Sequence, residues 1–110
     1  MTVQEKIHEY LSVHRDEMVE DIKTLIKVDS ARAEALPGKP YGEGAAEALH
    51  AGLSLFEKHG FLGKNWDNYA IDTVINGKEL GLDILAHLDV VPVTEDWTVT
   101  DGQKQHRLSL

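Results

Sequence analysis

The hydrophobic pattern of the chain changes its period once, near residue 61, and this change constrains the fold more than any other feature. Over residues 1–28, apolar side chains recur at three- and four-residue steps, which predicts an amphipathic helix. A second helix is predicted over 43–59, with Gly60 placed to end it in the left-handed conformation. The residues between them, 28–42, are rich in Pro and Gly and predict a loop.

Beyond residue 61 the apolar side chains follow the period of strands. One strand is predicted over 69–75, and a returning strand over 79–88 that is apolar enough to lie in the centre of a sheet. Asn76-Gly77 lies between them and is the strongest short hairpin signal, because both positions tolerate positive φ. The order predicts an α/β fold with two helices followed by a β-hairpin. We expect it to be incomplete, since little chain follows to cover the apolar strand.

Charge and cysteine content exclude several classes of function. Nineteen acidic residues against 11 basic ones give a net charge of −8, which opposes nucleic-acid binding. The absence of cysteine excludes disulfides, thiolate catalysis and sulfur-ligated zinc. No apolar stretch approaches the roughly 20 residues that cross a bilayer, and the first residues do not resemble a signal peptide. We therefore expect a cytoplasmic protein with neither nucleic-acid nor membrane partners.

The strongest chemical signal lies at the end of the predicted central strand. His87 and Asp89 are two residues apart, so on a strand their side chains leave from the same face. A neutral imidazole can bind a metal ion while a carboxylate takes the proton of its other nitrogen. Pro92 ends the strand, where ligand sites gather in α/β sheets. Spacing alone is weak evidence, because His14 and Asp16 repeat the pattern inside a helix, and because strand histidines are more often packed or hydrogen-bonded than ligands.

The residues around this pair carry a more specific signal, His87-Leu88-Asp89-Val90-Val91-Pro92 followed by Trp97. This run resembles the first metal-binding motif of the carboxypeptidase G/aminoacylase/carnosinase family of dinuclear-zinc peptidases. Residues 24–30 and 68–70 are also similar to that family. The sequence from Asp83 onward is most similar to that of the bacterial dipeptidase branch, which acts on Xaa-His and other dipeptides. The resemblance covers roughly residues 1–100.

The resemblance implies a role for each member of the pair. His87 would be a metal ligand, and Asp89 the catalytic-site carboxylate that orients the His87 ring. In the family two Zn²⁺ ions, with Mn²⁺ or Co²⁺ as alternatives, activate the water that hydrolyses a dipeptide. The implied fold is an α/β zinc-peptidase catalytic domain with a mixed sheet. Residues 1–100 would be its N-terminal part, and 101–110 a divergent tail that we expect to be disordered.

The other site residues of the family have no counterpart in the chain, which contains no Glu-Glu pair. A catalytic zinc needs about three protein ligands, so we expect this chain to be an inactive fragment of a dipeptidase. One alternative is a small non-catalytic α/β binding module that pairs with a partner through an exposed strand edge and ignores divalent metal. Another is a helical interaction protein that uses residues 1–28.

Overall fold

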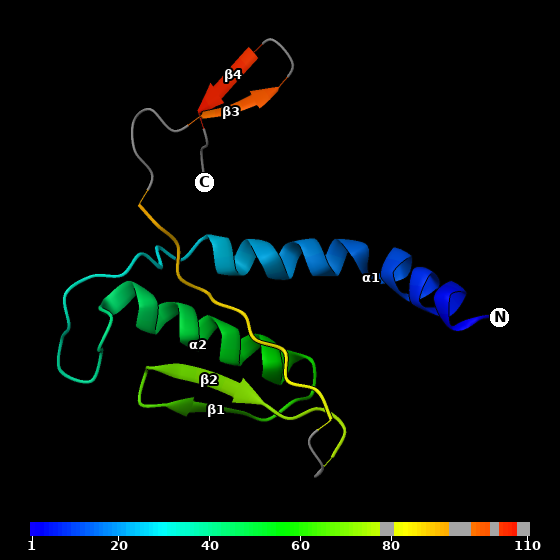
Figure 1. Ribbon diagram of the computed structural model, residues 1–110, viewed down its shortest axis with the longest axis horizontal. Coiled ribbons are helices and arrows are strands. Elements are labelled where there is room, and N and C mark those ends of the chain that lie inside the picture. The colour runs from blue at the N-terminus through cyan, green and yellow to red at the C-terminus, as the bar shows by residue number, and fades with distance from the viewer. Residues whose placement is uncertain (78–80, 93–97, 102–103, 108–110) are drawn as a thin grey trace.

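The computed structural model describes residues 1–77, 81–92, 98–101 and 104–107 (Figure 1). Two helices and an antiparallel strand pair confirm the α/β class and form an incomplete version of it. Within the described residues, neither helix is long and apolar enough to span a membrane. In chain order the elements are α1 (Val3–Ile26), α2 (Glu43–Lys58), β1 (Gly63–Trp66), β2 (Ala70–Thr73), β3 (Thr98–Asp101) and β4 (Lys104–Arg107).

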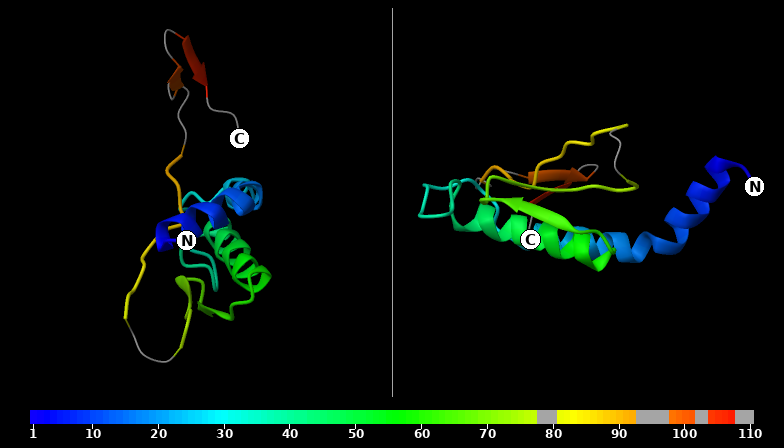
Figure 2. Two further views of the ribbon diagram at one scale, coloured as in Figure 1. Left: turned by 90° about the vertical axis from the view of Figure 1, so that its right-hand side faces the viewer. Right: turned by 90° about the horizontal axis from the view of Figure 1, so that it is seen from below.

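Helix α1 begins at a side-chain cap formed by Thr2. The Thr2 hydroxyl oxygen accepts a hydrogen bond from the Glu5 amide at 3.1 Å and lies 3.2 Å from the Glu5 carboxylate. The C-terminal half of α1 contacts α2, whereas the N-terminal half projects away from the rest of the molecule (Figure 2). The apolar stripe of that projecting half, which includes Val3, Ile7 and Tyr10, is therefore exposed.

Helix α2 is the centre of the packing, because α1 contacts it and β1 and β2 lie along it (Figure 1). Among the described residues, the buried apolar side chains are those of Ala46 and Ala48, both small and both on α2. Gly63 brings β1 against the helix, since a Cβ added there would lie 2.6 Å from Leu53 Cδ2 and 2.9 Å from Phe56 Cδ2. The core of the described residues is therefore small and centred on α2.

The hairpin forms one strand earlier than its sequence predicts. β2 pairs with β1, with Trp66 opposite Ala70, and not with the predicted strand at 79–88. The turn is Asp67-Asn68, whose φ values of 53° and 62° fit the type I′ geometry that hairpins favour. Hydrogen bonds between the Asn65 and Asn68 side chains and from the Asn68 amide to Asn65, each 2.8 Å long, hold this turn closed.

The predicted central strand is wrong for the residues that the structure describes. Asn76 and Gly77 do adopt positive φ values of 64° and 116°, so the chain turns where expected. Residues 81–88 then carry no strand pairing with any other described segment. Residues 79–80 of the predicted strand lie outside the described residues.

The last described residues contain a second strand pair. β3 and β4 are antiparallel, with Thr98 opposite Arg107 and Asp101 opposite Lys104. The expectation that residues 101–110 are a disordered tail stays a prediction. The boundary between a catalytic part and a tail at residue 100 stays a prediction.

Candidate functional site

The segment 81–92, which contains the predicted site residues, runs along α2 (Figure 1). Leu88 anchors it through its side chain and its carbonyl. A Cβ added to Gly52 would lie 3.2 Å from Leu88 Cδ1 and 2.7 Å from Ile71 Cδ1, so Gly52 lets both side chains reach the helix. The Ser30 hydroxyl donates a 2.8 Å hydrogen bond to the Leu88 carbonyl, and Ser30 is only 2% exposed.

The loop that carries Ser30 is itself held close to the start of α2. A Cβ added to Gly44 would lie 1.8 Å from the carbonyl oxygen of Asp29, so only glycine permits this approach. Helix α2 therefore packs on the loop after α1, and Ser30 of that loop holds the Leu88 carbonyl. This chain of contacts positions the segment on which His87 and Asp89 lie.

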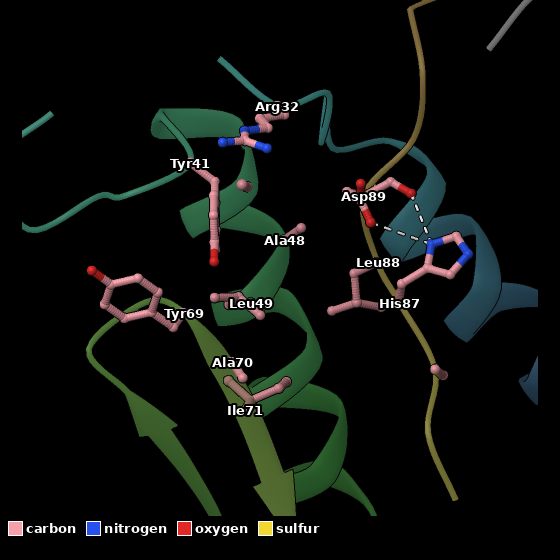
Figure 3. A pocket seen from close by; sticks show the side chains of 12 residues that line it. Arg32, Tyr41, Ala48, Leu49, Tyr69, Ala70, Ile71, His87, Leu88 and Asp89 are labelled. Carbon is pink, nitrogen blue, oxygen red and sulfur yellow. Dashed lines mark hydrogen bonds and ion pairs between the residues drawn. The ribbon is translucent and has the colours of Figure 1, made fainter. Parts of the chain in front are cut away.

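The structure brings His87 and Asp89 together, as their two-residue spacing predicts. His87 Nδ1 lies 3.3 Å from Asp89 Oδ1 and 3.1 Å from the Asp89 carbonyl oxygen (Figure 3). Both oxygens can accept the proton of Nδ1, which favours the tautomer whose Nε2 lone pair is free for a ligand. Within the described residues Nε2 has no hydrogen-bond partner, and the two side chains are 84% and 63% exposed.

A cavity of about 320 Å³ lies beside this pair, between α2, β2 and residues 86–89. Tyr41 and Tyr69 meet edge to face in its wall, with ring centroids 5.7 Å apart, and the Arg32 guanidinium lies 5.4 Å from the Tyr41 centroid. The His87 ring points away from these aromatic side chains (Figure 3). The cavity therefore adjoins the pair without bringing Arg32 or the tyrosines onto the imidazole.

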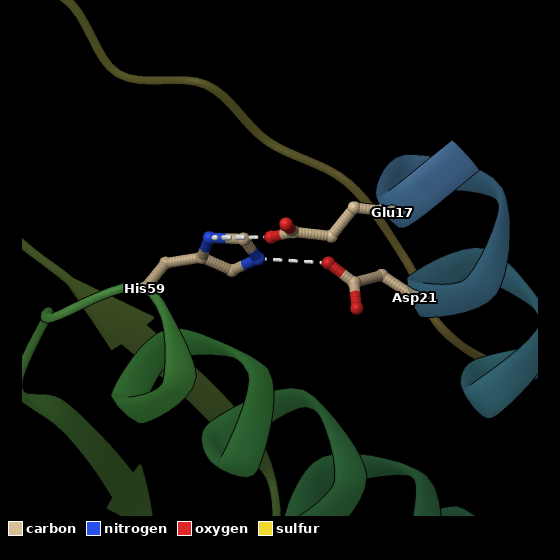
Figure 4. A group of neighbouring side chains, drawn as sticks. All are labelled: Glu17, Asp21 and His59. Atoms are coloured by element: carbon tan, nitrogen blue, oxygen red, sulfur yellow. Dashed lines mark hydrogen bonds and ion pairs between the residues drawn. The ribbon is translucent and has the colours of Figure 1, made fainter. Parts of the chain in front are cut away.

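A second polar group joins α1 to the end of α2 (Figure 4). His59 Nε2 lies 2.7 Å from Asp21 Oδ2, and His59 Nδ1 lies 3.8 Å from Glu17 Oε1. One ligand atom from each of these three residues lies within 4.8 Å of the others, so the group could hold a metal ion. Its sequence signal is faint, because only the four-residue spacing of Glu17 and Asp21 is local, and His59 lies 38 residues from Asp21.

Positive charge already balances this group. Lys58 Nζ lies 2.5 Å from Asp21 Oδ1. The hydrogen bond from Lys58, and after it the one from His59, lowers the pKa of Asp21 below its ordinary value. Asp21 in turn raises the pKa of Lys58. The arrangement is thus an ion-pair contact between two helices as it stands, and a bound cation would compete with the Lys58 ammonium for Asp21.

The chain is similar to bacterial dipeptidases. It is 35% identical over 86 residues to "Putative dipeptidase YtjP" of Bacillus subtilis, and 33% identical over 92 residues to the Beta-Ala-Xaa dipeptidase of Lactobacillus delbrueckii subsp. lactis. The matches cover 76% and 82% of this chain but 19% and 20% of the two relatives. No family model matches the chain, and no solved structure matches it significantly. The chain therefore belongs to the family of these dipeptidases, and it spans about one fifth of the length of the curated relatives it matches.

Proposed function

We propose that this chain is the part of a metal-dependent dipeptidase that supplies one ligand of its metal site. The observation that carries the proposal is the His87–Asp89 contact, found in a chain that is homologous to dipeptidases. The substrate class is a dipeptide, as the names of the relatives say of them. The reaction is hydrolysis of the single peptide bond of that dipeptide.

The two residues divide the work between binding and orientation. His87 presents Nε2 as the ligand atom, because Nδ1 is engaged by Asp89. Asp89 keeps the ring in one tautomer and one orientation, as carboxylates behind ligating histidines do. When bound, Zn²⁺, or Mn²⁺ or Co²⁺ in its place, would polarise the scissile carbonyl and lower the pKa of the attacking water. This donor set fits one position of such a site.

One ligand position does not make a catalytic site, which takes about three protein ligands. In the described part of the chain, Asp89 is the carboxylate beside His87, and it serves the ring rather than a second coordination position. The group of Glu17, Asp21 and His59 lies elsewhere, between the two helices. We therefore propose that the 110-residue chain by itself does not hydrolyse dipeptides.

The test is a chimera in which this chain replaces the matched region of the Bacillus subtilis relative. Hydrolysis of dipeptides is measured with Zn²⁺, Mn²⁺ or Co²⁺ and after chelation. We expect metal-dependent activity that His87→Ala abolishes and that Asp89→Asn lowers about 10- to 100-fold. His14→Ala is the matched control, because His14 has the same spacing to Asp16 but lies on the exposed helix α1. Activity that survives His87→Ala, or activity of the 110-residue chain alone, would contradict the proposal.

The non-catalytic binding module remains a second candidate because of one observation. Residues 81–92 are extended and have no strand partner among the described residues, which suits pairing with another chain. The dependence of activity and of partner binding on a metal ion distinguishes the binding module from the dipeptidase. A binding module would capture its partner equally well with a chelator present, and its chimera would show no hydrolysis.

A further inference from the structure

The chain has three asparagines, Asn65, Asn68 and Asn76, and of these only Asn76 is followed by glycine. Asparagine is a chemically labile residue, because the backbone nitrogen of the next residue can attack the carbon of its side-chain amide. A next residue without a Cβ hinders this attack least. The sequence therefore makes Asn76 the most reactive of the three, provided that the fold leaves it accessible.

The structure leaves Asn76 and Gly77 open, directly after β2. Both residues are exposed, and the preceding Val74 and Ile75 are 66% and 58% exposed. A Cβ added to Gly77 would meet no atom of the described chain within 4 Å, so no described group shields the nitrogen beside it. Gly77 has a φ of 116° and can leave it at little cost, because glycine populates both signs of φ. The pair thus has the access and the backbone freedom that ring closure requires.

The other two asparagines are held by hydrogen bonds at the turn between β1 and β2. The Asn65 side-chain amide donates to Asn68 Oδ1, and Asn65 Oδ1 accepts from the Asn68 backbone amide, each at 2.8 Å. The Asn68 side-chain amide donates a 2.8 Å bond to the Gly38 carbonyl. The nitrogen that would attack Asn68 is engaged as well, since the Tyr69 amide donates to the Trp66 carbonyl at 2.9 Å. Attack at either side chain must first break such bonds.

We propose that Asn76 is a site of spontaneous deamidation in the folded chain. The Gly77 nitrogen attacks Asn76 Cγ, so that an N–Cγ bond forms, the Cγ–Nδ2 bond breaks, and ammonia leaves with the proton of the Gly77 amide. Water then opens the resulting succinimide ring. Its attack at Cγ leaves an aspartate, and its attack at the main-chain carbonyl leaves an isoaspartate. Either product carries a new carboxylate, which changes the net charge from −8 to −9.

The isoaspartate product also changes the course of the backbone. Its main chain runs through Cβ and Cγ of the modified residue, which adds a methylene between β2 and the segment 81–92. The pairing of β1 with β2 lies before this point, and the Leu88 contact with α2 lies after it. The reaction therefore alters the connection between two parts of the structure and leaves their own contacts in place. It needs water alone and does not depend on the proposed dipeptidase function.

The test is incubation of the full 110-residue chain for days at mildly alkaline pH, followed by peptide mapping with mass spectrometry. Conversion of Asn76 should be at least about tenfold faster than that of Asn65 or Asn68, because breaking one or two hydrogen bonds costs about as much. Two products of equal mass should separate by chromatography. Asn76→Gln, whose longer side chain would require a larger ring, should remove the conversion and leave the circular dichroism unchanged.

The same mapping in urea separates the effect of the sequence from that of the fold. We expect urea to accelerate conversion of Asn76 by no more than about threefold, because its folded environment is already open. If Asn76 stayed intact in the folded chain, or if urea accelerated its conversion tenfold or more, the proposal would be overturned. Conversion of Asn65 or Asn68 at the rate of Asn76 would also overturn it. So would a gain of charge that persists in Asn76→Gln.

Discussion

Replacing Gly44 with alanine tests the contact on which the position of the His87 segment depends. Gly44 lies in the first turn of α2, and a Cβ there would be 1.8 Å from the Asp29 carbonyl oxygen. Real Cβ contacts essentially never fall below 3.0 Å, so the loop and the helix must separate by about 1.2 Å, the difference between the two distances. The obstacle is backbone, which cannot swing aside as the end of a side chain can.

The expected change in the free energy of unfolding combines two effects of opposite sign, the higher helix propensity of alanine and the cost of overpacking. Alanine in place of glycine gains up to about 1 kcal/mol in a helix, and less in its first turn. Overpacking against an unyielding neighbour costs about 3 kcal/mol, the upper end of the usual range. Gly44→Ala should therefore lower the free energy of unfolding by about 2 kcal/mol. Far-UV circular dichroism in urea would report this as a midpoint about 1–2 M lower.

A second glycine provides the control. Gly81 has open space around its position and no left-handed φ, so Gly81→Ala should change the free energy of unfolding by no more than about 0.5 kcal/mol. Gly52→Ala should fall between the two, because its 2.7 Å contact is with the flexible end of Ile71. If Gly44→Ala unfolded at the same urea concentration as Gly81→Ala, the loop could not be packed on α2 as described.

Three smaller perturbations test the other contacts. Ser30→Ala leaves the half-buried Leu88 carbonyl without its donor, so the free energy of unfolding should fall by about 1–3 kcal/mol in the same urea titration. Lys58 lowers the pKa of Asp21, so the ionised carboxylate stabilises the fold at neutral pH, and that contribution is lost as the pH falls below the ordinary value of 3.8 towards the lowered one. Asp21→Asn should therefore flatten the acid limb of stability measured between about pH 2 and pH 7, whereas an unchanged limb would refute the ion pair. Thr2→Ala removes the side-chain cap of α1 and should cost about 1 kcal/mol of helix stability, seen as faster amide exchange in the first turn.

The helices could be predicted from the sequence because their signals are local. The Thr2 cap and the 3.6-residue period place the start of α1, and Gly60, with φ of 86°, follows α2 as its sequence predicts. The His87–Asp89 contact was also predictable, since its partners are only two positions apart in the sequence. In each case the residues that contact one another are close together in the sequence, so the local pattern contains all of them.

The hairpin shows what a local signal leaves undetermined. Asn68 and Asn76 both adopt positive φ, so both mark places where the chain turns. A turn residue says where the direction changes and not which strands pair on either side of it. The bonds between Asn65 and Asn68 close the earlier turn, and β1 lies against α2 through Gly63. The contact of Asp21 with Lys58 and His59 was beyond the sequence for a similar reason, because it depends on how two helices cross.

Segment 81–92 differs from the helices and the hairpin. Its sequence is typical of a strand covered on both faces, and the described residues do not cover it. Its composition is that of a covered strand, yet Leu85 is 94% exposed and the backbone has no strand partner among those residues. A metal ligand works only when its position is held to within about half an ångström, and a His87 ring that is 84% exposed on an unpaired segment has only Asp89 to orient it. Coordination by His87, as proposed, would therefore require further contacts to its segment. Under that proposal the matched region would supply the ligand, and residues outside it would have to hold the segment in place.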